Sequence, residues 1–288
     1  MLNAPKPLRE SLRERGWTEG KDLVFEWRYA DGNPERYAGF AAELVRLEVN
    51  VIVAATDGIV APAMAATSTI PIVFAVCSDP VRQGFVGSLA HPGGNVTGSS
   101  GTCSGSQLHA KQLELLKKTV PGASRVPVLW YRDTPDKEME VTETISAAQA
   151  LGLQMRSLRV QSPDDFVTTF DNATRAHADA ILILNSGFII SWREQLAQLA
   201  GRYHLPAMYG TREYVAQAGG LMAYGPNVPD LFRRAADHVD KILRGAKPGD
   251  LPVDQPTTFD FVINLKTAAS LGLTIPPAVL AQATEVIQ

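Results

Sequence analysis

Polar side chains that could bind a ligand stand directly after predicted short strands in the first hundred residues. They are Thr56 and Asp57, Ser78 and Asp79, and Ser99 and Ser100. The first two of these strands, 51–55 and 70–76, are apolar runs with the pattern of a buried strand. Because ligands of open α/β sheets sit at the carboxyl ends of the strands, these groups are candidate ligand contacts. Either aspartate could accept an ammonium group, and the hydroxyls could bind a carboxylate.

The two aspartates also have structural interpretations. Asp57 could cap a helix that begins near residue 59, and capping is compatible with lining a ligand site. Asp79 and Pro80 could merely start a helix at Val81. Both interpretations stay open for each aspartate.

A second set of candidates follows predicted strands in the later part of the chain. It combines aromatic rings with amide and guanidinium groups, at Tyr131, Asn185, Phe188, Tyr209, Arg212 and Tyr224, with Asn227 close behind. Such residues could hold a small amphipathic ligand, with rings against its apolar part and polar groups at its ends. Alternatively, Arg212 could pair with Glu213 or another surface acid. The rings of Phe188, Tyr209 and Tyr224 could simply pack in the core.

Catalytic and metal-binding patterns are missing from the sequence. The five histidines are scattered singly, and no HxxxH, CxxC, GxSxG, GxGxxG or GxxxxGK[ST] spacing occurs. Cys77 ends an apolar run, where a reactive thiol could sit, but nothing in the sequence identifies a base for it. We therefore expect no metal, no cofactor and no enzymatic activity.

Composition narrows the class of protein further. The 288 residues are 45% hydrophobic and 20% charged, which is typical of a soluble globular protein long enough for two domains. A net charge of −3 argues against nucleic acid or an anionic membrane as partner. No apolar run approaches the roughly 20 residues of a membrane span. Cys77 and Cys103 are too few for a disulfide framework, and we favour two separate thiols over one bridge.

Strand and helix patterns alternate along the chain and predict an α/β protein. The predicted strands are 22–29, 51–55, 70–76, 95–98, 126–131, 153–160, 180–184, 206–209, 219–225 and 258–263. The predicted helices are 7–16, 34–48, 59–68, 81–89, 104–119, 137–151, 163–177, 191–203, 229–244, 264–271 and 276–287. Two successive strand–helix series, with a seam near residues 98–104, predict two doubly wound Rossmann-like domains with parallel sheets.

The order of several short motifs resembles the substrate-binding proteins of ABC importers. The motifs are SDPV, GFV, SLA and PGGNVTG within residues 78–98, KQLELL at 111–116, LPAMY at 205–209, REY at 212–214, GGLMAYG at 219–225 and FVINLKTA at 261–268. The resemblance covers residues 8–288 and points to the subfamily that includes tryptophan-type amino-acid receptors. It implies the type I periplasmic-binding fold with a multi-crossover hinge. By this analogy, one domain comprises 1–100 with 226–252, and the other 101–225 with 253–288.

The resemblance also implies a function. It predicts a periplasmic, catalytically inert protein that captures a small solute, such as an amino acid, in the cleft between its domains and delivers it to the membrane subunits of a permease. We expect a monomer. Two alternatives stay open: a receptor module of the same fold for a signalling partner, and a two-domain isomerase or racemase. The enzyme would need two acid/base groups facing each other, and the sequence offers no convincing pair.

The first residues depart from the family pattern. Residues 1–7 have neither the charged start nor the apolar core of a signal peptide, although the resembled family is exported. No strand pattern precedes the helix at 7–16, although a right-handed strand–helix–strand unit begins with a strand. We therefore expect that the chain starts late and lacks a first strand, which would leave unpaired backbone groups on neighbouring strands.

Overall fold

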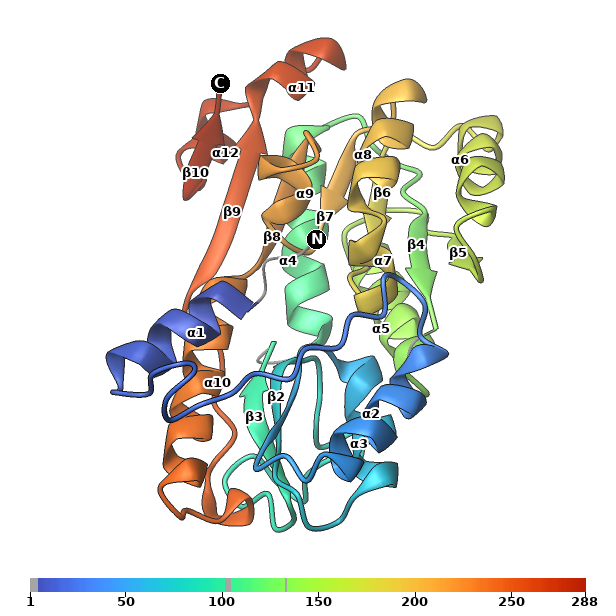
Figure 1. Ribbon diagram of the computed structural model, residues 1–288. Coiled ribbons are helices and arrows are strands. Elements are labelled where there is room, and N and C mark those ends of the chain that lie inside the picture. Colours follow the sequence, from blue (N-terminus) through green and yellow to red (C-terminus); the bar gives the residue numbers. More distant parts are fainter. Residues whose placement is uncertain (1–4, 102–104, 133) are drawn as a thin grey trace. The chain divides into compact units, whose positions relative to one another are not determined.

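The computed structural model describes residues 5–101, 105–132 and 134–288 (Figure 1). The chain forms two compact units. Unit 1 comprises Met1–Cys103 with Val228–Thr257, and unit 2 comprises Ser104–Asn227 with Thr258–Gln288. No helix among the described residues is long and apolar enough to cross a membrane.

Unit 1 is built on a parallel sheet of three strands in the order β1-β2-β3. The strands are β1 Ile52–Ala54, β2 Ile72–Cys77 and β3 Val96–Ser100. The helices are α1 Pro5–Glu14, α2 Arg36–Arg46, α3 Asp57–Ala66 and α10 Val228–Leu243, with a short 3-10 turn at Pro248–Asp250. Parallel pairing places the ends of all three strands at one edge of the sheet.

The central strand β2 is buried on both faces because its side chains alternate between two helical layers. Phe74 belongs to a cluster that includes Ala63 of α3. Val73 belongs to a second cluster with Leu12 of α1 and Phe232 of α10. This burial explains why the strand reads as a continuous apolar run rather than an alternating one.

Unit 2 contains a sheet of seven strands in the order β10-β9-β8-β7-β6-β4-β5, in which only the pair β8–β9 is antiparallel. The strands are β4 Val128–Tyr131, β5 Ser157–Val160, β6 Ile181–Ile183, β7 Ala207–Tyr209, β8 Met222–Pro226, β9 Phe259–Asn264 and β10 Glu285–Ile287. The helices are α4 Gly105–Thr119, α5 Lys137–Ala150, α6 Asp165–Arg175, α7 Gly187–Ser191, α8 Arg193–Arg202, α9 Glu213–Ala216, α11 Leu265–Ser270 and α12 Pro277–Leu280. Leu113 and Leu116 of α4 pack with Val128, Leu182 and Met222 of the strands in one core cluster.

The predicted strand at 22–29 is wrong. Only an isolated bridge joins Leu23 to Glu19, and no strand of the described chain pairs with residues 24–29. Leu23, Phe25 and Trp27 still pack against the cluster around Leu12, so the alternation correctly marks the inward side chains. Alternation specifies which side chains are buried, but a strand also needs a backbone partner.

The predicted helix at 81–89 is also wrong, because this stretch is a series of turns. Gly84 has φ of 73°, which ends any helical run. The backbone N–H groups of Gln83 and Phe85 donate to the carbonyls of Asp79 and Pro80 instead of building further helical turns.

The predicted helix at 276–287 is too long. Helix α12 ends at Leu280, and β10 then pairs in parallel with β9. The short helices α7 and α9 were not predicted from the sequence. The other predicted strands and helices are present, with shifted ends.

Two backbone segments of unit 2 approach so closely that only glycine fits between them. A Cβ at Gly225 would overlap the carbonyl oxygen of Gly210. We predict that Gly225→Ala lowers the free energy of unfolding by about 3 kcal/mol, because the backbone must move to relieve the overlap. Gly201 is a matched control, since a Cβ there in α8 meets nothing within 4 Å. Gly201→Ala should change stability by about 1 kcal/mol or less, in the stabilising direction. Denaturant unfolding checks both variants, and equal effects would contradict the steric argument.

Candidate functional site

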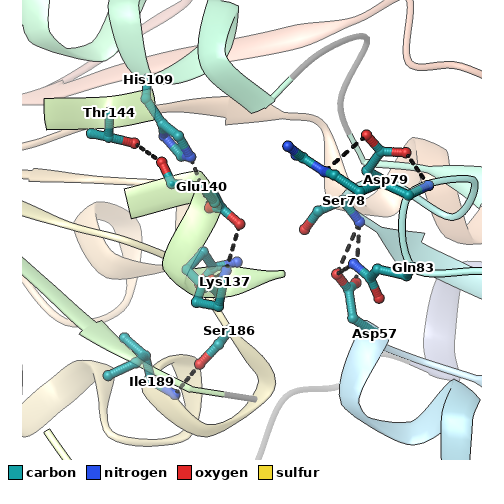
Figure 2. Close-up of polar contacts among 12 residues, drawn as sticks. Asp57, Ser78, Asp79, Gln83, His109, Lys137, Glu140, Thr144, Ser186 and Ile189 are labelled. Atoms are coloured by element: carbon teal, nitrogen blue, oxygen red, sulfur yellow. Dashed lines mark hydrogen bonds and ion pairs between the residues drawn. The ribbon is translucent and has the colours of Figure 1, made fainter. Parts of the chain in front are cut away.

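Asp57 joins the ends of β1 and β2 at the carboxyl edge of the sheet in unit 1. Its carboxylate accepts the backbone N–H of Ser78 at 3.1 and 3.2 Å, and the side-chain amide of Gln83 at 2.9 Å (Figure 2). Asp57 is the first residue of α3 and is buried. These bonds hold the two strand ends together and give the carboxylate a structural role.

Asp79 organises the turn that follows β2. One carboxylate oxygen accepts the backbone N–H of Arg82 at 3.0 Å, and the other lies 3.4 Å from the Arg82 Nε atom (Figure 2). Ser100, at the end of β3, donates through Oγ to the carbonyl of Ser78 at 3.5 Å. Asp79 therefore stabilises its own turn, as the structural interpretation of Asp79-Pro80 anticipated in part.

Among the residues that the structure describes, two candidate hydroxyls of unit 1 have no hydrogen-bond partner. They are Thr56 Oγ1 at the end of β1 and Ser99 Oγ in β3, and both oxygens are buried. The side-chain oxygen of Gln83 is also buried and has no hydrogen-bond partner among the described residues. Buried polar atoms in native proteins are nearly always satisfied by protein, water or ligand. These unsatisfied hydroxyls are the groups of unit 1 best able to bind a ligand oxygen.

An aromatic pair lies at the carboxyl end of β4 in unit 2. The ring of Tyr131 stacks on the ring of Phe188 from α7, with centroids 4.1 Å apart and planes 24° apart. Phe188 is buried and also packs against Phe166, whereas Tyr131 is partly exposed. Both residues were predicted as ligand contacts from the sequence, and the structure brings their rings into contact.

Asn185 follows β6 at the same edge of this sheet. Its side-chain oxygen is buried and accepts no hydrogen bond. Ser186 caps α7 by accepting the backbone N–H of Ile189 at 3.1 Å (Figure 2). Among the described residues, Asn185 therefore joins Thr56 and Ser99 as a candidate with an unsatisfied buried polar atom.

The remaining candidates of unit 2 pack or pair within the fold, although the buried hydroxyl of Tyr209 has no hydrogen-bond partner among the described residues. Tyr209 is fully buried and stacks on Tyr214 at 4.5 Å, and burial raises the pKa of its phenol. Arg212 forms an ion pair with Glu285, and this bond raises the pKa of the guanidinium. The ring of Tyr224 stacks on Phe259 with centroids 5.8 Å apart. These contacts match the packing and ion-pair interpretations given above.

The structure also contains a buried polar network that the sequence analysis missed. His109 and Gln112 come from α4, and Lys137 and Glu140 come from α5; all four are buried. Glu140 Oε1 lies 2.9 Å from His109 Nε2, and Glu140 Oε2 accepts from Lys137 Nζ at 3.0 Å (Figure 2). Burial alone would raise the pKa of Glu140, but the charge of Lys137 and the hydrogen bond of His109 lower it to about 2.

This network reaches two strands of the sheet. Gln112 donates through Nε2 to the carbonyl of Tyr224 in β8 at 2.7 Å. That orientation turns Gln112 Oε1 toward His109 Nδ1, at 2.9 Å. Both ring nitrogens of His109 therefore face hydrogen-bond acceptors. Lys137 donates to the carbonyl of Asn185 at 3.2 Å.

Only a weak sequence signal marks this network. His109 and Gln112, like Lys137 and Glu140, stand three residues apart and face the same side of a helix. Nothing in the sequence shows that the two pairs meet across 31 residues. Among the residues that the structure describes, no group of three or more His, Cys, Asp or Glu side chains could hold a metal ion. Cys77 is buried, and Cys103 lies outside the described residues.

The α/β units with parallel sheets have the type I periplasmic-binding fold of solute-binding proteins. The chain belongs to the family of ABC transporter substrate binding proteins, whose family model matches residues 1–287.

Three relatives illustrate the similarity. A tyrosine-binding protein of Clostridioides difficile (strain R20291) is 23% identical over 270 residues, which cover 94% of this chain and 76% of that protein. The crystal structure of a conserved domain protein from Vibrio cholerae is 28% identical, with a TM-score of 0.91, covering 98% of this chain and 94% of the other. A protein from Streptococcus pneumonia, solved in complex with L-Trp, is 26% identical, with a TM-score of 0.89, covering 99% and 94%.

The low pKa of Glu140 makes a prediction about acid stability. A carboxyl group whose pKa falls from 4.5 to about 2 on folding stabilises the protein above pH 4.5, and this contribution is lost as the pH falls toward 2. We predict that Glu140→Gln lowers the free energy of unfolding at pH 7 by an amount on the order of 3 kcal/mol. The difference from wild type should shrink in acid.

Glu138 is the matched control on the same helix, because it is exposed and lies 3.7 and 3.8 Å from two arginines. Glu138→Gln should change stability by about 0.5 kcal/mol or less. Urea unfolding between pH 2.5 and pH 7 measures both variants. A wild-type minus Glu140→Gln difference that does not vary with pH would show that Glu140 is not ionised in the fold.

Proposed function

We propose that this chain is the substrate-binding component of an ABC importer and that its substrate is an aromatic amino acid. Family membership supports the class of protein. The names of two relatives, a tyrosine-binding protein and a protein solved with L-Trp, support the substrate class. Within the chain itself, the observation that carries the proposal is the set of buried polar atoms, at or near the strand ends, that have no hydrogen-bond partner among the described residues.

The aromatic pair suits the apolar end of such a ligand. Tyr131 is partly exposed on one side while its ring rests on the buried ring of Phe188. A rigid aromatic platform favours a flat side chain, because ring–ring stacking adds about 0.5–1.5 kcal/mol to the burial of apolar area.

The unsatisfied hydroxyls suit the carboxylate of an amino acid. Thr56 and Ser99 can each donate one hydrogen bond to an oxygen atom. The Asp57 carboxylate accepts the backbone N–H of Ser78, and this hydrogen bond fixes the carboxyl edge of the sheet in unit 1. Each unit thus offers its own candidate contacts for such a ligand.

The proposal includes the rest of the importer function. The protein acts in the periplasm, as a monomer without catalytic activity, and passes the amino acid to permease subunits. These statements rest on family membership. A receptor for a signalling partner would bind the same ligands, so uptake by cells with and without the gene separates the two functions.

Thermal unfolding in the presence of single amino acids tests the substrate class. We predict that L-tryptophan, L-tyrosine or L-phenylalanine raises the melting temperature, because ligand at 100 times its Kd stabilises the native state by about 2.7 kcal/mol. Lysine, aspartate and glycine at the same concentration serve as controls and should give no shift. Isothermal titration calorimetry then gives the Kd. A shift with a non-aromatic solute alone would refute the aromatic substrate class.

Two residues of β3 allow a matched test of the unsatisfied hydroxyls. Thr97 is fully buried like Ser99, but its hydroxyl already donates to the carbonyl of Leu251 at 2.8 Å. We predict that Ser99→Ala weakens amino-acid binding about 10-fold and leaves the stability of the ligand-free protein unchanged or higher. Thr97→Val should do the opposite, lowering stability by about 1 kcal/mol without changing the Kd. Calorimetry and urea unfolding on both variants measure the split. Loss of stability with unchanged Kd in Ser99→Ala would assign that hydroxyl to the fold.

A further inference from the structure

Asn185 is held from two sides. Its backbone carbonyl accepts a hydrogen bond from Lys137 Nζ at 3.2 Å. On the side-chain side, Gly210 packs so closely that a Cβ there would lie 2.9 Å from the Asn185 Cβ atom. These two contacts hold the backbone and the Cβ atom of Asn185 in place, while its buried side-chain oxygen has no donor among the described residues. A fixed acceptor without a donor is a site prepared for an N–H or O–H group from elsewhere.

Lys137 is an unusual residue for this role because it is 3% exposed. Glu140 compensates its charge at 3.0 Å, and Glu140 is in turn fixed by His109 at 2.9 Å. Replacing a buried ion pair by apolar side chains is often neutral or stabilising, so stability alone does not explain the network. What the ion pair provides is geometry: the ammonium group lies within hydrogen-bond distance of both Glu140 Oε2 and the Asn185 carbonyl oxygen.

We propose that Lys137 is a positioning residue for ligand recognition, which acts by fixing Asn185 so that the Asn185 side-chain oxygen accepts a hydrogen bond from the α-ammonium group of the bound amino acid. This inference rests on the proposed function, and it assigns the ammonium end of the substrate to unit 2. His109 and Gln112 belong to the same device, because they orient Glu140 and tie the network to the carbonyl of Tyr224.

The experiment is a double-mutant cycle on substrate affinity. Isothermal titration calorimetry measures the Kd of L-tryptophan and L-tyrosine for wild type, Lys137→Met, Asn185→Ala and the double variant. Asn185→Ala should weaken binding about 10- to 100-fold, the range expected for a hydrogen bond to a charged group. Lys137→Met should weaken it about 10-fold, and the double variant should bind no more weakly than Asn185→Ala alone, because Lys137 acts through Asn185.

A ligand without the ammonium group separates positioning from general damage. The probe is indole-3-propionate, which keeps the ring and the carboxylate of tryptophan. Its Kd should change less than 2-fold in Lys137→Met and in Asn185→Ala. Lys118→Met is the control for removing a lysine, because Lys118 is exposed on α4 and pairs with Glu114 at the surface. If Lys137→Met does not fold, Lys137→Arg takes its place, because it keeps the buried charge but displaces the donor. Lys137→Arg should also weaken tryptophan binding about 10-fold, and it should cause no further loss of affinity when combined with Asn185→Ala.

Each result decides between the two proposals. Additive losses in the double variant, or equal losses for tryptophan and indole-3-propionate, would overturn the positioning role while the proposed function stands. Tight binding of tryptophan by Asn185→Ala would overturn the ammonium contact and also leave the function intact. A wild-type chain that binds no amino acid would overturn both.

Discussion

A buried carboxylate can remain ionised only if the surrounding structure compensates its charge, and Glu140 imposes this condition on the carboxyl edge of the sheet in unit 2. Lys137 and His109 meet the condition from α5 and α4. Lys137 also donates to the carbonyl of Asn185, just after β6, and His109 contacts Gln112, which donates to the carbonyl of Tyr224 within β8. One electrostatic requirement is thus linked by hydrogen bonds to two parts of the sheet.

The candidate residues divide by whether the fold already satisfies their polar atoms. Asp57, Asp79 and Arg212 have partners that explain their presence without a ligand. Thr56 and Ser99 have none, although their oxygens are buried to the same degree as satisfied groups nearby. Burying such an atom without a partner destabilises the fold by about 1–3 kcal/mol. The unsatisfied hydroxyls of Thr56 and Ser99 therefore do not stabilise the ligand-free protein. We use this difference from the satisfied groups to distinguish candidate ligand contacts from structural residues.

Local patterns were sufficient for most of the fold. The apolar run at 70–76 and the polar residues after it predicted β2 and its end, because burial on both faces leaves a clear signature in one short stretch. The alternating run at 22–29 failed, since its backbone partner is a property of the whole sheet. The stretch 81–89 failed for a local reason, the positive φ of Gly84. Tyr131 and Phe188 could be named from their places after strands, but their contact across 57 positions could not.

The buried network shows why a site is harder to predict than a fold. Strand and helix patterns depend on neighbours in sequence, whereas the role of Lys137 depends on a carboxylate, an imidazole and a carbonyl brought together by two helices and a strand end. A lysine three residues before a glutamate reads, in sequence, as an exposed helical pair worth a few tenths of a kcal/mol. Burial changes the energetic role of the same two residues. In low-dielectric surroundings their hydrogen bonds are stronger, and loss of either partner would leave a buried charge unpaired at a high cost in stability. In this protein the informative signal is thus the combination of a fully satisfied ion pair and an unsatisfied acceptor beside it: the first fixes the second in place, and only the second is left to a ligand.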